Sequence, residues 1–137
     1  MNFRITNLPS TQEKDIIFKE LLEYNLKYLE DKDVHELGIF LEDESGTKAA
    51  GLIGTTHGNW LEINYLWVSK ENRGQNIGSK LVNKAESIAK ERGCKYAFVN
   101  TFDFQAPKFY EKLGYKEELT LTEYPITGKR HYYTKVI

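Results

Sequence analysis

The most informative segment of the chain is Val68-Ser69-Lys70-Glu71-Asn72-Arg73-Gly74-Gln75-Asn76-Ile77-Gly78-Ser79-Lys80-Leu81. It leaves an apolar, strand-like segment, passes through a polar turn that contains glycine, and enters a segment with helical periodicity. A turn of this kind leaves backbone N–H groups unpaired at a helix start, where the helix dipole also favours negative charge. The stretch therefore predicts an anion site, and phosphate is the usual occupant of such sites.

The segments on either side of this turn predict a strand–helix–strand unit. Apolar residues recur at helical spacing from Ile77 to Arg92, and Gly93 stands where a C-terminal cap is expected. Residues 60–68 before the turn and 95–101 after the helix have the character of strands. Because one helix joins them, we expect these two strands to run parallel.

The N-terminal half predicts a strand, a helix and an antiparallel meander. Residues 2–7 alternate well enough for a first strand, and Ser10 with Glu13 has the spacing of a capping box. Apolar residues then continue at helical spacing as far as residue 29. Strands are expected at residues 35–41, 48–56 and 60–68. In the third strand, the side chains expected to share one face are Leu61, Ile63, Tyr65 and Trp67.

The C-terminal part predicts a short helix and two closing strands. Pro107 suits a first helical position and Gly114 a C-terminal cap, and the closing strands are expected at about 115–122 and 129–136. The expected fold class is therefore α/β, with a mixed, mostly antiparallel sheet of six to seven strands flanked by helices. No internal repeat or linker is apparent, so residues 1–137 are expected to form a single domain.

Composition restricts the classes of function. The 19 Lys and Arg residues nearly balance the 20 Asp and Glu residues, which argues against binding of nucleic acid. No apolar stretch suits a signal peptide or a bilayer span, so we expect a cytoplasmic protein without membrane association. Cys94 is the single cysteine, and His35, His57 and His131 are scattered along the chain, so no metal site is expected.

Three phosphate-binding schemes can be compared with the turn. A P-loop needs Gly-Lys-Ser/Thr, whereas Gly78-Ser79-Lys80 has the wrong order. The dinucleotide fingerprint needs three glycines, and only Gly74 and Gly78 are present. A third scheme fits. Leu66-Trp67-Val68 followed by Arg73-Gly74-Gln75-Asn76-Ile77-Gly78 resembles the signature of the GNAT superfamily of acetyl-CoA-dependent N-acetyltransferases, and Phe109-Tyr110-Glu111-Lys112-Leu113-Gly114-Tyr115 resembles its second motif.

The resemblance covers essentially the whole chain and implies acetyl-CoA as co-substrate. It implies that backbone N–H groups of the turn, with Arg73, hold the pyrophosphate, and that the strand before the turn pairs with the pantetheine arm. The family's central glycine is Asn76 here, and many members place an asparagine where this chain has Asp103. The expected cofactor-binding residues are Leu66, Trp67, Val68, Arg73, Gly74, Gln75, Asn76, Ile77, Gly78 and Ser79.

The resemblance also implies two catalytic residues. Tyr110 is the expected general acid that protonates the departing thiolate. Because Tyr110 also falls in a pattern of apolar residues at helical spacing, packing in the core is the alternative role. Glu62 is the expected general base, because members that acetylate histones carry their glutamate at the matching position. An exposed sheet glutamate is the alternative for Glu62. Asn64 is expected on the same face and would orient the substrate or a water molecule.

The predicted function is N-acetyl transfer to a primary amine by direct attack in a ternary complex. A non-catalytic acyl-CoA-binding sensor or interaction module is the alternative, and an RNA-binding α/β domain is a third option that the charge balance opposes. The acceptor is expected to be an amine-bearing small molecule or a peptide. Exposed edge strands at the C-terminus would allow a homodimer.

Overall fold

The computed structural model describes all residues 1–137, which fall into two compact units, residues 1–32 and 33–137. In the first unit, α1 (Thr11–Leu26) begins at the predicted capping box, with Glu13 N donating to Ser10 Oγ over 3.0 Å and Ser10 N to Glu13 Oε2 over 3.1 Å. The helix ends at Leu26, three residues earlier than the apolar pattern indicates. The strand predicted at residues 2–7 is wrong: this alternating segment has no neighbouring strand with which to form a ladder.

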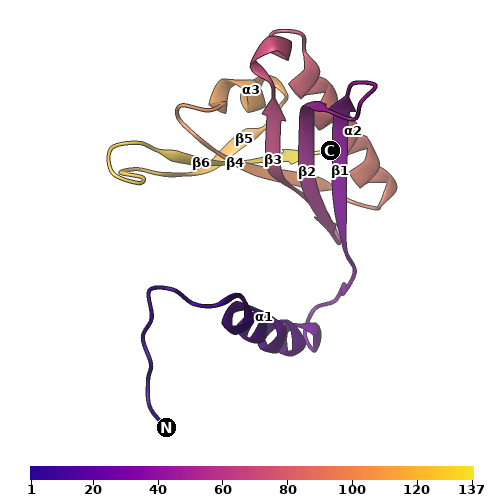
Figure 1. Cartoon of the computed structure of the whole chain (residues 1–137). Coiled ribbons are helices and arrows are strands. Elements are labelled where there is room, and N and C mark those ends of the chain that lie inside the picture. The colour runs from indigo at the N-terminus through magenta and orange to yellow at the C-terminus, as the bar shows by residue number, and fades with distance from the viewer. The chain divides into compact units, whose positions relative to one another are not determined.

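The second unit is built around one six-stranded sheet of order β1-β2-β3-β4-β6-β5 (Figure 1). Every neighbouring pair is antiparallel except β3 and β4, which confirms the predicted parallel unit. The predicted fold class, a mixed and mostly antiparallel sheet with helices, is therefore confirmed. The strands are β1 (Val34–Glu42), β2 (Lys48–His57), β3 (Trp60–Val68), β4 (Tyr96–Phe102), β5 (Lys116–Leu121) and β6 (Arg130–Val136).

The core lies between this sheet and α2 (Ile77–Glu91), which packs against β1, β2 and β3. Its buried face presents small and branched side chains, which lets the helix lie close to the strands. A one-turn helix η1 (Lys70–Asn72) precedes α2, and the short helix α3 (Pro107–Lys112) follows β4. The core residues of α2 and the central strands are Leu81, Val82, Ala85, Ala89, Leu52, Leu61, Ile63, Ala97 and Val99.

A β-bulge in β3 changes which side chains share a face. Ile53 of β2 pairs with Tyr65, but the next residue of β2 pairs with Ile63, so Asn64 is an extra residue in β3. Leu61 and Ile63 lie in the core, as expected, whereas Tyr65 is 73% exposed. The prediction that Tyr65 and Trp67 share a face with Leu61 and Ile63 is therefore wrong, because the bulge reverses the alternation after Ile63.

The two parallel strands at the centre of the sheet are paired over only part of their length. β3 and β4 pair from Trp60 with Tyr96 to Ile63 with Val99, and their remaining residues have no partner in each other. Because the bulge follows directly at Asn64, the two strands separate at this point. The sheet is therefore open between the C-terminal halves of β3 and β4.

Candidate active site

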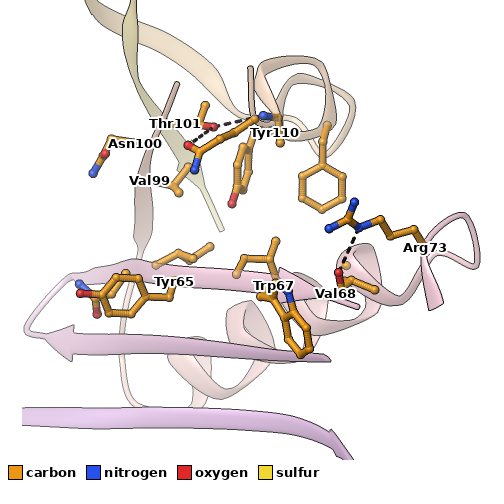
Figure 2. A pocket seen from close by; sticks show the side chains of 15 residues that line it. Tyr65, Trp67, Val68, Arg73, Val99, Asn100, Thr101 and Tyr110 are labelled. Atoms are coloured by element: carbon orange, nitrogen blue, oxygen red, sulfur yellow. Dashed lines mark hydrogen bonds between the residues drawn. The ribbon is translucent and has the colours of Figure 1, made fainter. Parts of the chain in front are cut away.

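A cavity of about 590 Å³ lies where β3 and β4 separate, and Figure 2 shows the side chains around it. Strand β3 forms one wall, and the end of β4 with α3 forms the other. Arg73 stands at one end of the cavity, and Asn100 and Tyr65 at the other (Figure 2). The lining residues are Ile63, Asn64, Tyr65, Leu66, Trp67, Val68, Arg73, Gly78, Val99, Asn100, Thr101, Gln105, Ala106, Phe109 and Tyr110.

A second cavity of about 270 Å³ lies at the N-terminus of α2. It shares four lining residues with the first cavity: Val68, Arg73, Gly78 and Phe109. Because the two cavities share this much wall, they form one path from the helix terminus into the opening of the sheet. A long, thin ligand with an anionic group at one end fits such a path.

The helix terminus itself has the features of an anion site. The N-cap Asn76 has φ 58° and ψ 19° and makes no side-chain capping bond to the helix. The first N–H groups of an α-helix have no partner within the helix, so they remain available to a ligand. Asparagine tolerates the left-handed conformation better than most residues, which explains how the turn forms without the family's glycine.

Arg73 adds a cation at the junction of the two cavities. Its Nε donates to the carbonyl oxygen of Val68 over 3.1 Å, which holds the side chain against the end of β3 (Figure 2). The guanidinium nitrogens beyond Nε remain free to face a phosphate. Of the ten expected cofactor-binding residues, nine line one or both cavities; Gln75 lines neither.

Tyr110 is at once a packed side chain and a cavity residue. It is only 5% exposed, and its ring meets Phe109 and Tyr115 edge-on at centroid distances of 5.0 and 5.6 Å. Its hydroxyl nevertheless points into the space between α3 and β3 (Figure 2). Burial raises the pKa of Tyr110 to about 12, so the hydroxyl keeps its proton at any ordinary pH.

A buried polar group supports Tyr110 from behind. Tyr115 Oη donates to Glu86 Oε2 over 3.0 Å, and Lys135 Nζ contacts Glu86 Oε1 at 2.7 Å. Burial, followed by the adjacent Glu86 carboxylate, raises the pKa of Tyr115, so this hydroxyl is also a fixed donor. These bonds fix the Tyr115 ring, and with it the wall against which Tyr110 packs.

Glu62 and Asn64 lie on the sheet face opposite α2, but only Asn64 lines the cavity. The side chain of Asn64 accepts a hydrogen bond from Thr55 Oγ1 over 2.9 Å. Glu62 is half-buried and pairs with Phe98 across the parallel ladder. The structure therefore brings Tyr110 and Asn64 to the cavity and leaves Glu62 just outside its lining.

Several polar residues of the cavity were missed by sequence reasoning. Thr101 Oγ1 accepts from Ala106 N over 3.2 Å, and Gln105 Oε1 accepts from Phe102 N over 2.9 Å. These bonds tie the end of β4 to the start of α3, and Asn100 precedes them on β4. One signal in the sequence could have found these residues: polar residues interrupt the otherwise apolar β4 at its C-terminal end.

His131 and Asp103 form a separate cluster that lines neither cavity. His131 Nδ1 lies 2.8 Å from Glu117 Oε1, and its Nε2 contacts Asp103. Hydrogen bonding to Glu117, and then to Asp103, raises the pKa of His131. Asp103 is thus engaged by a histidine, in agreement with its exclusion from the expected site.

Cys94 is buried, and burial raises the pKa of its thiol, as expected for a small core residue.

None of the helices has the length and apolar character that crossing a bilayer requires. Comparisons with known proteins show the family to which the chain is similar. The sequence profile of the Acetyltransferase (GNAT) family matches residues 4–115. Acetyltransferase Atu2258 of Agrobacterium fabrum is 32% identical over 115 residues, which cover 84% of each chain. Blasticidin-S acetyltransferase of Streptomyces morookaense is 42% identical over 83 residues, which are 60% of this chain and only 61% of that protein.

Solved structures show the same fold. A crystal structure of an acetyltransferase from Bacillus cereus superposes with a TM-score of 0.85 at 30% identity, covering 98% of both chains. An aminoglycoside 6'-N-acetyltransferase complexed with coenzyme A superposes with a TM-score of 0.65 at 18% identity, covering 99% of this chain and 97% of the other. The family resemblance drawn from the two sequence motifs is confirmed, and the chain belongs to the GNAT family of acetyltransferases.

Proposed function

We propose that this acetyltransferase binds acetyl-CoA in the two joined cavities and transfers the acetyl group to a primary amine of a small molecule. The observation that carries the proposal is the continuous path from the α2 terminus to the opening between β3 and β4, with the Tyr110 hydroxyl beside it. The relative that acetylates blasticidin S supports an antibiotic-like amine as the acceptor class. The expectation of one domain over residues 1–137 stays a prediction, as does homodimer formation.

The proposed binding mode assigns one task to each part of the path. The free N–H groups at the start of α2 and the Arg73 guanidinium hold the pyrophosphate. The unpaired edge of β3 at Leu66, Trp67 and Val68 offers backbone groups to the amides of the pantetheine arm, in the manner of an added strand. The thioester then lies in the opening of the sheet, near Tyr110. No metal ion is needed for this chemistry.

The proposed reaction is direct attack in a ternary complex. The neutral amine nitrogen forms a bond to the thioester carbon, the C–S bond breaks, and the amine loses one proton. A hydroxyl with a pKa of about 12 is a weaker acid than a thiol of about 8.5, so we propose that Tyr110 stabilises the departing thiolate by a hydrogen bond instead of protonating it as the expected general acid. The thiolate then takes its proton from water.

The proton that leaves the amine is assigned to Glu62 through a water molecule, because Glu62 lies outside the cavity lining. The Glu62→Gln variant is expected to lower kcat/KM about tenfold to 100-fold. The control is Glu91→Gln, an exposed carboxylate at the end of α2. If Glu62→Gln keeps the wild-type kcat/KM, another group is the base.

Replacing Asn76 with glycine is expected to tighten binding of CoA about threefold to tenfold. Glycine adopts positive φ without cost, and its substitution removes a side chain from the pyrophosphate site. Asn76→Ala is the opposite control, because alanine at this φ should cost about 1 kcal/mol of stability and weaken binding. Isothermal titration of both variants with CoA, together with urea unfolding, tests this. Weaker binding by Asn76→Gly would show that the asparagine side chain contacts the ligand favourably.

The test of the function as a whole is thiol release from acetyl-CoA with a panel of amines. The panel contains blasticidin S, aminoglycosides, polyamines and short peptides with free α-amines. Rapid thiol release with at least one antibiotic-like amine supports the proposal. Tight binding of CoA without thiol release in the whole panel would favour the alternative, a non-catalytic acyl-CoA-binding module.

A further inference from the structure

Arg130, at the start of β6, is held in an unusual way for a half-buried cation. Its guanidinium lies 5.3 to 5.7 Å from the ring centroids of three aromatic side chains, Phe102, Tyr124 and Tyr132. Its Nε donates to Asn100 Oδ1 over 2.9 Å, and its Nη1 donates to Tyr124 Oη over 3.0 Å. These contacts fix the plane and direction of the guanidinium.

No carboxylate in the protein forms an ion pair with Arg130. The nearby acid Asp103 is engaged by His131 instead. Both of these hydrogen bonds use neutral acceptors and leave other N–H groups of the guanidinium without a partner. A half-buried arginine without a counter-ion is costly, so it is a good candidate for a site that receives an anion from a ligand.

The position of Arg130 connects it with the acceptor end of the cavity. Asn100, to which it is bonded, lines the cavity at the end away from Arg73 (Figure 2). Because the Asn100 oxygen accepts from Arg130, the Asn100 amide group is turned so that its NH₂ points away from the guanidinium. The far end of the cavity therefore offers donors from Asn100, while Arg130 lies behind Asn100 and does not itself line the cavity.

We propose that Arg130 and Asn100 recognise a carboxylate carried by the acceptor, so that the preferred acceptors are amines that also bear a carboxylate. This inference rests on the proposed function and names a substrate class for it. The pyrophosphate is bound at the opposite end by Arg73 and the α2 terminus, so the two anionic groups do not compete. Asn100 supplies the hydrogen bond to the carboxylate, and Arg130 holds Asn100 in place and supplies the positive charge behind it.

The test uses matched acceptors that differ only in one group: amino acids and dipeptides against their carboxamides. Wild type is expected to prefer the carboxylate member, and Arg130→Gln is expected to lower kcat/KM for that member about tenfold to 100-fold more than for the carboxamide. Lys129→Gln, which removes the adjacent exposed cation, is the control and should keep the preference. An equal loss for both members of each pair would overturn the proposal, because it would show a structural role alone.

A binding measurement separates this inference from the proposed function. Wild type labelled with ¹⁵N-arginine is titrated with glutarate and with glutaramide while the Arg130 Nε–H resonance is followed by NMR. A saturable shift of this resonance with glutarate only supports the site even if no acceptor is turned over, and the Arg130→Gln spectrum, which lacks the resonance, assigns it. Equal or absent shifts with the two probes overturn it. If Arg130→Gln does not fold, Arg130→Lys is used in its place, because lysine keeps the positive charge but lacks the planar guanidinium with its several N–H donors.

Discussion

The Tyr110→Phe variant is expected to lose about 100-fold in kcat while its KM for acetyl-CoA changes little, because the hydroxyl acts on charge that develops only in the transition state. The ring is buried against Phe109 and Tyr115, and phenylalanine preserves these contacts. The fold is therefore expected to survive the substitution. Steady-state thiol release with the best acceptor of the panel, together with thermal unfolding, measures both effects.

A control and a pH profile make this expectation specific. Tyr96 lies on β4, and its ring packs on Trp60 outside the cavity. Tyr96→Phe, which removes only the hydroxyl, should therefore keep wild-type kcat. Because burial raises the pKa of Tyr110 to about 12, no loss of activity from its ionisation is expected up to about pH 10. A loss of activity with an apparent pKa near 10 that disappears in Tyr110→Phe would contradict this assignment.

Gly78→Val is expected to weaken CoA binding roughly 10-fold to 100-fold with little change in the free energy of unfolding. A Cβ at Gly78 would lie 3.2 Å from Phe109 Cζ and 3.9 Å from Val68 Cγ2. These residues form the shared wall of the two cavities, so the larger side chain narrows the path at its junction. Valine has a somewhat better helix propensity than glycine, which offsets part of the strain in the fold.

Isothermal titration with CoA and urea unfolding distinguish the two effects of Gly78→Val. Asn83→Ala, on the exposed face of the same helix, is the control and should bind CoA like wild type. Wild-type affinity in Gly78→Val would mean that the ligand does not pass between Gly78 and Phe109. If Gly78→Val loses binding because it is completely unfolded, CoA binding is measured with Gly78→Ala instead, which adds the smallest possible side chain at this position.

The features that could be predicted from the sequence are those that depend on neighbours along the chain. The capping box at Ser10 and Glu13 depends on residues three apart, and the glycine-bearing turn before α2 depends on consecutive residues. For this reason both appear where the sequence places them. The phosphate end of the candidate site is of this kind, since it consists of backbone groups at a helix start.

The features that sequence reasoning missed depend on pairing between distant segments. The extra residue Asn64 is visible only in the register of β3 against β2, and it changed the face on which Tyr65 lies. Asn100 and Arg130 are 30 positions apart, so their hydrogen bond required the order of β4 and β6 to be known. The wrong strand at residues 2–7 has the same cause, because alternation describes a strand but does not supply its partner.

The short pairing between β3 and β4 gives the sheet a mechanical weak point. Four residue pairs join the half made of β1, β2 and β3 to the half made of β4, β6 and β5. We expect the two half-sheets to turn about these four pairs, and a ligand bound in the gap beyond them to restrict that motion. Filling the gap should therefore stiffen the angle between the two half-sheets, so that the empty enzyme twists more freely than the loaded one.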